Sequence, residues 1–130
     1  MCTGYLIGAF DLLNVRDLDI IDQARDRAGR VVLAILDDAE VERLYGRPPV
    51  VPLLERVMLA AHIRGIHQVV VHGTDEAERA QRVASVRLAV SGEPTPDHDL
   101  ALITPRRETC AEQVRIATGT LALSLSAAVA

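Results

Sequence analysis

The feature of this sequence that most constrains its fold is an uninterrupted apolar run at residues 31–36, Val-Val-Leu-Ala-Ile-Leu. A strand with one face in water alternates apolar and polar residues, whereas a strand buried on both faces is apolar throughout. Related short runs occur at residues 5–8, 68–72, 86–90 and 100–103. Together they predict a central parallel sheet of about five strands with helices on both faces.

Segments with helical periodicity or helix-forming composition separate the predicted strands. They lie at residues 16–28, 39–44, 52–64, 76–84 and 108–117. Strands that alternate with helices favour right-handed crossovers between parallel strands. We therefore predict an α/β, Rossmann-like three-layer sandwich over residues 1–117 and assign residues 118–130 to a C-terminal tail or linker.

Composition limits the partners that the chain can bind. The net charge is −4 and only 2% of the residues are aromatic, which argues against nucleic-acid binding. All 14 basic residues are arginine, so mechanisms that need a lysine are excluded. No apolar run approaches the roughly 20 residues that span a bilayer, and we expect a cytoplasmic protein without membrane contact. Cys2 and Cys110 form no metal motif, and we interpret both as inert.

The stretch from Gly4 to Leu18 is typical of a strand, a glycine-bearing turn and the first turn of a helix. Unpaired N–H groups and the positive end of the helix dipole make such a junction an anion site. In parallel sheets, ligands bind beyond the carboxyl ends of the strands. The strand ends that we expect to converge here are residues 8–11, 37–38, 72–74, 91–93 and 104–107.

Residues 8–18, Gly-Ala-Phe-Asp-Leu-Leu-Asn-Val-Arg-Asp-Leu, resemble the GxFDxxHxGHxxxL signature of the cytidylyltransferase family. Other segments resemble further parts of that family. They are Asp37-Asp38 after the second strand, residues 46–56 in a loop ending in Glu-Arg, residues 66–70 in the third strand, and residues 104–109 in an Arg-Thr segment. The resemblance covers residues 4–116 and implies the α/β fold of the family.

The resemblance implies an enzyme that transfers CMP from CTP to a small phosphate or phosphonate acceptor and releases pyrophosphate. Acceptor types in the family are glycerol phosphate, phosphocholine, phosphoethanolamine and hydroxyalkyl phosphonates. The resemblance also implies Mg²⁺ as the cofactor of an active enzyme and a homodimer, for which the apolar residues 50–54 offer a surface. The implied catalytic positions are Asn14, Arg16 and Asp17. The implied nucleotide-binding positions are Gly8, Ala9, Phe10, Arg47, Arg56, Arg106 and Thr109.

Both histidines of the HxGH motif are replaced in this chain. Asn14 stands at the first, Asp17 at the second, and Arg16 at the glycine between them, while Tyr45 aligns with a lysine of the family. Asn14 still offers a neutral N–H, and the Arg16 guanidinium suits bidentate binding of phosphate. The Asp17 carboxylate is favoured at a helix N-terminus but repels a triphosphate. Loss of one transition-state donor typically lowers a rate about 10²–10³-fold.

These features also have structural interpretations that need no ligand. Arg16 is then a solvent-exposed residue at a helix start, Asp37-Asp38 a helix N-cap, and His72 a structural histidine rather than a relocated catalytic one. Three hypotheses stay open: a working but diverged cytidylyltransferase, a pseudoenzyme that serves as a nucleotide-binding or dimerisation module, and an unrelated flavodoxin-like ligand-binding protein. Residues 46–56 argue against the third.

Overall fold

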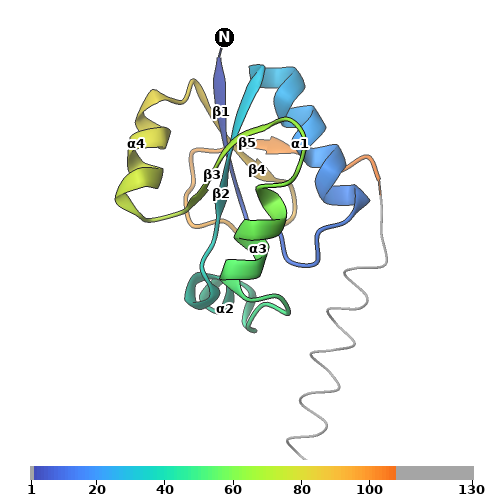
Figure 1. Ribbon diagram of the computed structural model, residues 1–130, viewed down its shortest axis with the longest axis vertical. Coiled ribbons are helices and arrows are strands. Elements are labelled where there is room, and N and C mark those ends of the chain that lie inside the picture. Colours follow the sequence, from blue (N-terminus) through green and yellow to red (C-terminus); the bar gives the residue numbers. More distant parts are fainter. Residues whose placement is uncertain (1, 108–130) are drawn as a thin grey trace, which may run out of the picture.

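The computed structural model describes residues 2–107, which form five strands and four helices (Figure 1). The elements are β1 (Thr3–Gly8), α1 (Val15–Ala28), β2 (Arg30–Ile35), α2 (Asp38–Tyr45), α3 (Leu53–Ala60), β3 (Ile66–Val71), α4 (Asp75–Val83), β4 (Val86–Val90) and β5 (Ala101–Ile103). The predicted helix at residues 108–117, the tail at residues 118–130, Thr109 and Cys110 lie outside the described residues. No helix among residues 2–107 has the length and apolar character needed to cross a membrane.

All five described strands run parallel in one sheet, in the order β3-β2-β1-β4-β5. At the centre, Leu6 of β1 is level with Leu33 of β2 and Leu88 of β4. From β1 the chain builds outward through β2 and β3, and it then returns to the other side of β1 with β4 and β5. The direction of building therefore changes between β1 and β4. The predicted parallel α/β sheet is confirmed.

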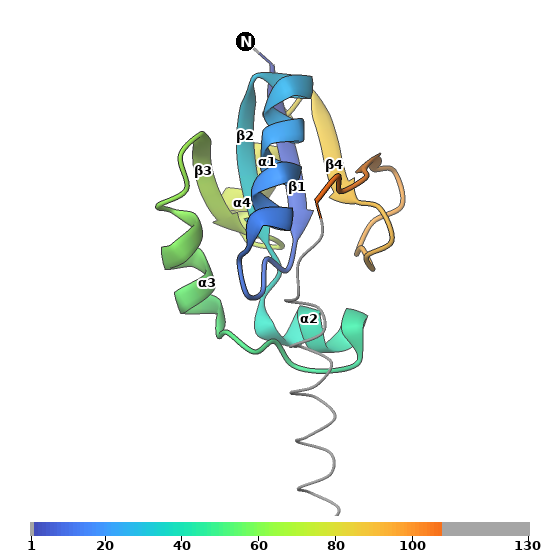
Figure 2. The ribbon, with the colours of Figure 1, turned by 90° about the vertical axis from the view of Figure 1, so that its right-hand side faces the viewer.

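Helices cover both faces of the sheet, which makes three layers (Figure 2). On one face, α1 and α3 bury residues such as Ile20 and Ala60 against the strands. On the other face, α4 packs Ala77 onto the sheet. Leu33 and Ala34, neighbours in β2, enter the first and the second of these clusters respectively. This two-sided burial explains why the run at residues 31–36 contains no polar side chain.

Helix α3 ends at Ala60 rather than at the predicted residue 64. The Ala61 N–H still bonds to the Val57 carbonyl, but the N–H groups of His62, Ile63 and Ile66 bond to residues three positions back, which is the spacing of tight turns and not of an α-helix. Gly65 then has φ of +94°, and a Cβ there would lie 2.7 Å from the guanidinium of Arg25. The close approach of α1 at a left-handed glycine ends the segment and allows β3 to begin at Ile66.

Candidate functional site

The turn between β1 and α1 has a strained backbone. Phe10 and Leu12 have φ of 50° and 53°, in the left-handed region that residues other than glycine rarely adopt. A Cβ on Gly8 would come within 2.9 Å of the Phe10 ring, which is 5% exposed and belongs to the core. Gly8 therefore leaves room for Phe10, while the Ala9 carbonyl accepts a hydrogen bond from Arg56. Nucleotide contacts by residues 8–10 stay a prediction.

Asn14 caps α1, and both of its amide hydrogens are bonded within the protein. Its Oδ1 accepts from the Arg16 backbone N–H at 2.9 Å. Its Nδ2 donates to the Leu12 carbonyl at 2.7 Å and to the Asp17 carboxylate at 3.2 Å. Asp17 is only 6% exposed. The two residues that align with the histidines of HxGH thus contact each other at the start of the helix.

Arg16 forms an ion pair with Glu93, a residue between β4 and β5. Arg16 Nη1 lies 2.9 Å from Glu93 Oε1, and the two side chains are 23% and 22% exposed. The hydroxyl of Tyr45, the last residue of α2, donates to Glu93 Oε2 at 3.3 Å. The interpretation of Arg16 as a solvent-exposed residue is therefore wrong. Glu93 is not among the predicted site residues, because its partner Arg16 is 77 residues away in the sequence, although its place at a strand end is a signal.

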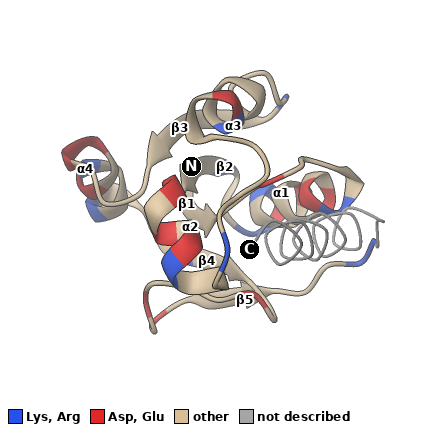
Figure 3. Cartoon of the chain, turned by 90° about the horizontal axis from the view of Figure 1, so that it is seen from below, with Lys and Arg blue, Asp and Glu red and all other residues tan. Residues whose placement is uncertain are grey.

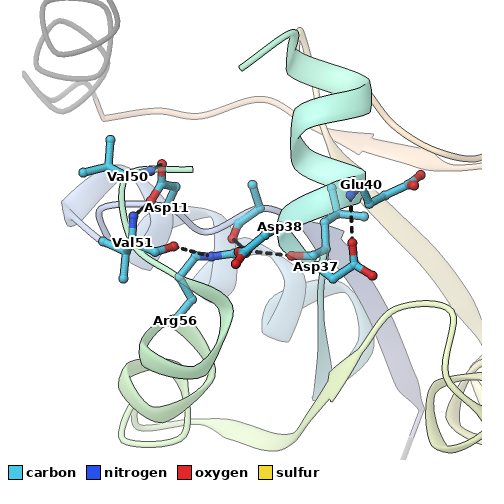
Figure 4. A network of polar contacts seen from close by, with 9 residues as sticks. Asp11, Asp37, Asp38, Glu40, Val50, Val51 and Arg56 are labelled. Atoms are coloured by element: carbon cyan, nitrogen blue, oxygen red, sulfur yellow. Dashed lines mark hydrogen bonds and ion pairs between the residues drawn. The ribbon is translucent and has the colours of Figure 1, made fainter. Parts of the chain in front are cut away.

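Asp11 fixes the loop that precedes α3 (Figure 4). The Asp11 carboxylate is 6% exposed and accepts the backbone N–H groups of Val50 and Val51, each at 2.8 Å. Two charge-assisted hydrogen bonds on one buried carboxylate hold this loop over the end of β1. Asp11 therefore acts as a structural anchor for the segment that resembles the Glu-Arg loop of the family.

The guanidinium of Arg56 links four segments at the same end of the sheet (Figure 4). Nε donates to the Val51 carbonyl (2.9 Å), Nη1 to the carbonyls of Ala9 (2.8 Å) and Leu36 (2.7 Å), and Nη2 to the Asp38 carboxylate (2.6 Å). The Arg56 side chain is 0% exposed. These bonds use four of the five N–H donors of the guanidinium, and the predicted phosphate contact of Arg56 stays a prediction. The described contacts make Arg56 a scaffold residue.

Arg106 fastens the segment after β5 to α1. Its backbone N–H, Nε and Nη2 all donate to the Asp19 carboxylate, at 2.8, 2.9 and 2.7 Å. These hydrogen bonds hold the pKa of Asp19 below its ordinary value, against the opposing effect of burial. The Arg106 side chain is nevertheless 62% exposed. Its predicted contact with phosphate stays a prediction, and the structure adds a carboxylate partner that the sequence did not indicate.

One structural interpretation from the sequence, the N-cap before α2, is confirmed. Asp37 caps α2 by accepting the Glu40 backbone N–H at 2.7 Å. His72 Nδ1 lies 2.8 Å from the hydroxyl of Tyr5, which belongs to the apolar cluster under α4. Burial lowers the pKa of His72 and raises the pKa of Tyr5 to about 12. His72 thus has a hydrogen-bond partner within the protein, on the sheet face opposite α1, and its structural role stays a prediction.

A pocket of about 20 Å³ lies beside the turn after β1. Its lining consists of Ala9, Asp11, Val41, Tyr45, Arg47, Pro48 and Pro49. This volume is about that of one water molecule. Arg47, predicted to contact phosphate, and Tyr45 thus lie together at the carboxyl end of the sheet. Figure 3, which views this end, shows acidic and basic residues mixed on α2.

A protein-family model and several known proteins are similar to this chain in sequence. A family model described as cytidylyltransferase-like matches residues 5–116. The bifunctional protein HldE of Halorhodospira halophila is 36% identical over 101 residues, which cover 73% of this chain and 21% of that protein. HldE of Gluconacetobacter diazotrophicus is 37% identical over 73 residues, or 55% of this chain and 15% of that protein. The chain thus spans about a fifth of the length of these relatives or less.

A solved structure shares the fold. The lipopolysaccharide core biosynthesis protein of Thermoplasma volcanium superposes with a TM-score of 0.66 over 84% of this chain and 99% of that protein, at 11% sequence identity. At this identity the likeness concerns the fold alone. The strand order, the glycine-bearing turn before α1 and the match over residues 5–116 agree, and the chain belongs to the cytidylyltransferase-like family.

Proposed function

We propose that this domain binds a nucleotide of the CTP type at the carboxyl end of its sheet and has lost the nucleotidyl transfer of its family. The observation that carries the proposal is the 3.2 Å hydrogen bond from Asn14 Nδ2 to the Asp17 carboxylate. These two residues stand at the positions of the HxGH histidines, and here they bind each other.

Transfer of CMP needs donors that neutralise the charge developing on the phosphates. Asn14 gives one Nδ2 hydrogen to the Leu12 carbonyl and the other to Asp17, so both are engaged within the turn. Asp17 adds a negative charge where the family places a donor. If each missing donor lowers the rate about 10²–10³-fold, the loss of two lowers it about 10⁴–10⁶-fold.

Nucleotide binding is supported by features that these substitutions leave in place. The start of α1 presents the positive end of a helix dipole. It follows β1, next to the point between β1 and β4 where α/β sheets bind their ligands. Arg16 and Arg47 add positive charge at this end of the sheet. Membership of the cytidylyltransferase-like family favours CTP or a related nucleotide as the ligand.

The family implies Mg²⁺, and the described residues do not fit a resident site for it. Residues 2–107 contain no group of three or more histidine, cysteine, aspartate or glutamate side chains placed to hold a metal ion. The buried Asp11 carboxylate already accepts two backbone N–H groups. Mg²⁺ therefore enters our test as the counter-ion of CTP, since it prefers phosphate oxygens and water, and we derive no step through it.

Thermal unfolding with CTP and Mg²⁺, with ATP and Mg²⁺ run in parallel, tests binding. Ligand at about 100 times its dissociation constant stabilises a fold by about 2.7 kcal/mol. We expect a rise in melting temperature that is larger for CTP than for ATP. If millimolar CTP has no effect on the wild type, the binding proposal fails. If CTP stabilises only the Asp17→His variant, the Asp17 carboxylate closes the site.

Pyrophosphate release tests the loss of transfer. We expect none above background when CTP is supplied with glycerol phosphate, phosphocholine, phosphoethanolamine or a hydroxyalkyl phosphonate. Release from the wild type would instead establish the second candidate, a working but diverged cytidylyltransferase. That candidate is favoured by Arg16, whose partly exposed guanidinium near the start of α1 is suited to phosphate. The Arg16→Gln variant would then lose the activity.

We further infer that α3 carries the surface of a homodimer. Leu54, Met58 and Leu59 are 72%, 56% and 53% exposed, and Val50 in the preceding loop is 43% exposed. Four large apolar side chains along one helix and its approach favour a protein interface. Sedimentation of the wild type and of the Leu54→Glu variant tests this. We expect a dimer that the variant converts to a monomer, and a wild-type monomer would contradict the inference.

A further inference from the structure

We propose that Glu93 is a built-in competitor for the phosphate groups of the bound nucleotide. In the described structure its carboxylate is bound by Arg16 and Tyr45, two residues that flank the proposed site. A phosphate that enters the site exchanges with Glu93 on Arg16. The proposal rests on the proposed nucleotide binding and specifies what limits it.

The place of Glu93 in the fold supports this role. Ligands of α/β sheets bind where the direction of sheet building changes, between the loops that follow the two strands concerned. Here those strands are β1 and β4. Arg16 follows β1, and Glu93 follows β4 in a turn held by a hydrogen bond from its own N–H to the Val90 carbonyl (3.3 Å). The ion pair between Arg16 and Glu93 therefore spans the two loops at this point.

The chemistry of the contacts is that of an anion site. Arg16 Nη1 donates to one oxygen of Glu93 at 2.9 Å, and the Tyr45 hydroxyl donates to the other at 3.3 Å. A guanidinium and a hydroxyl are also the donors that bind phosphate oxygens. Two donors from α1 and α2 thus hold a carboxylate of the protein where they are able to hold an anionic ligand.

Partial exposure makes the exchange feasible. The Arg16 and Glu93 side chains are 23% and 22% exposed, unlike the fully buried Arg56 side chain. A phosphate bound to Arg16 would also meet the negative charge of Glu93. This repulsion acts on each charged phosphate of the ligand and not on the nucleoside. Glu93 consequently lowers the affinity for a nucleoside triphosphate relative to the nucleoside itself.

Calorimetric titration of the Glu93→Gln variant tests the proposal, with Mg²⁺–CTP and cytidine as probes. Glutamine keeps the size of the side chain and an acceptor oxygen for Arg16 but removes the charge. We expect the affinity for Mg²⁺–CTP to rise about tenfold, as removal of one like charge a few ångströms away allows, and the affinity for cytidine to stay unchanged. The matched control, Glu78→Gln on α4, removes one exposed charge away from the site and leaves both affinities unchanged.

The double variant Arg16→Gln/Glu93→Gln assigns the gain to the freed guanidinium. We expect the tenfold rise to disappear, because the phosphate then lacks the donor for which Glu93 competes. Glu93→Ala, checked for folding by thermal melting, replaces the glutamine variant if the latter does not fold. If the wild type binds Mg²⁺–CTP and the folded Glu93 variants bind it no better, this proposal is overturned and the proposed function stands. If neither wild type nor variant binds Mg²⁺–CTP, both are overturned.

Discussion

Two arginines at the same end of the sheet, Arg56 and Arg16, show how burial divides one residue type between two uses. Arg56 is 0% exposed in its side chain and donates four hydrogen bonds to three carbonyls and the Asp38 carboxylate. Arg16 is 23% exposed and pairs with Glu93. The sequence predicts a ligand contact for both. The structure makes the first part of the scaffold and leaves the second able to exchange its partner.

The largest effect on stability that this comparison predicts follows from removal of the Arg56 guanidinium. The Arg56→Met variant keeps much of the side-chain volume but leaves Asp38 and three carbonyls without their donor. The Asp38 carboxylate is 51% exposed and stays solvated, but a buried carbonyl without its donor costs about 1–3 kcal/mol, so the loss at three carbonyls amounts to about 3–5 kcal/mol after local relaxation. We expect a fall of that size in the free energy of unfolding, measured by chemical denaturation. The matched control is Arg43→Met, which removes an exposed ion pair with Glu40 on α2 and should leave the stability nearly unchanged.

A smaller loss of stability is expected when Asp11 is replaced, since its carboxylate holds the loop that Arg56 also contacts. The Asp11→Ala variant leaves the N–H groups of Val50 and Val51 without their acceptor. Hydrogen bonds to a charged group contribute about 1.5–3 kcal/mol each, and loop relaxation and water recover part of this. We expect a loss of about 2 kcal/mol and faster hydrogen exchange at both amides. Unchanged exchange at Val50 and Val51 would contradict the anchoring role.

The fold was predictable because it follows from patterns within short segments, such as continuous apolar runs and helical periodicity. A run such as residues 31–36 has to be buried on both sides wherever it lies. The first helix ends at residue 28, as predicted, and Gly29 follows it with φ of 87°. The charged contacts were not predictable in this way, because their partners are distant in sequence. Arg106 and Asp19 are 87 residues apart, and Arg56 and Ala9 are 47 apart. Residue type indicated a phosphate ligand for these arginines, and only the tertiary structure revealed their acceptors within the protein.

The pair of Arg106 and Asp19 predicts a pH dependence of stability. Arg106 lowers the pKa of Asp19 in the folded state, so the carboxylate stabilises the fold above its unfolded pKa. This contribution is lost as the pH falls through the lowered, folded pKa. We expect the wild type to lose more stability than Asp19→Asn between pH 7 and the acid range, measured by urea denaturation. Equal losses in the two proteins would show that Asp19 carries no such linkage.

The smallest stability effect is expected at Arg16, and it sharpens the comparison with Arg56. A partly exposed ion pair contributes at most about 1 kcal/mol, because solvent screens the charges and both side chains lose freedom when they pair. The coupling of Arg16 and Glu93, from denaturation of the two single variants and the double variant Arg16→Gln/Glu93→Gln, should therefore stay below about 1 kcal/mol. A coupling of about 3 kcal/mol or more, comparable in size to the loss of stability expected for Arg56→Met, would place Arg16 in the scaffold as well. A weak coupling is what exchange requires, since a ligand displaces Glu93 only when the pair itself stabilises the fold little.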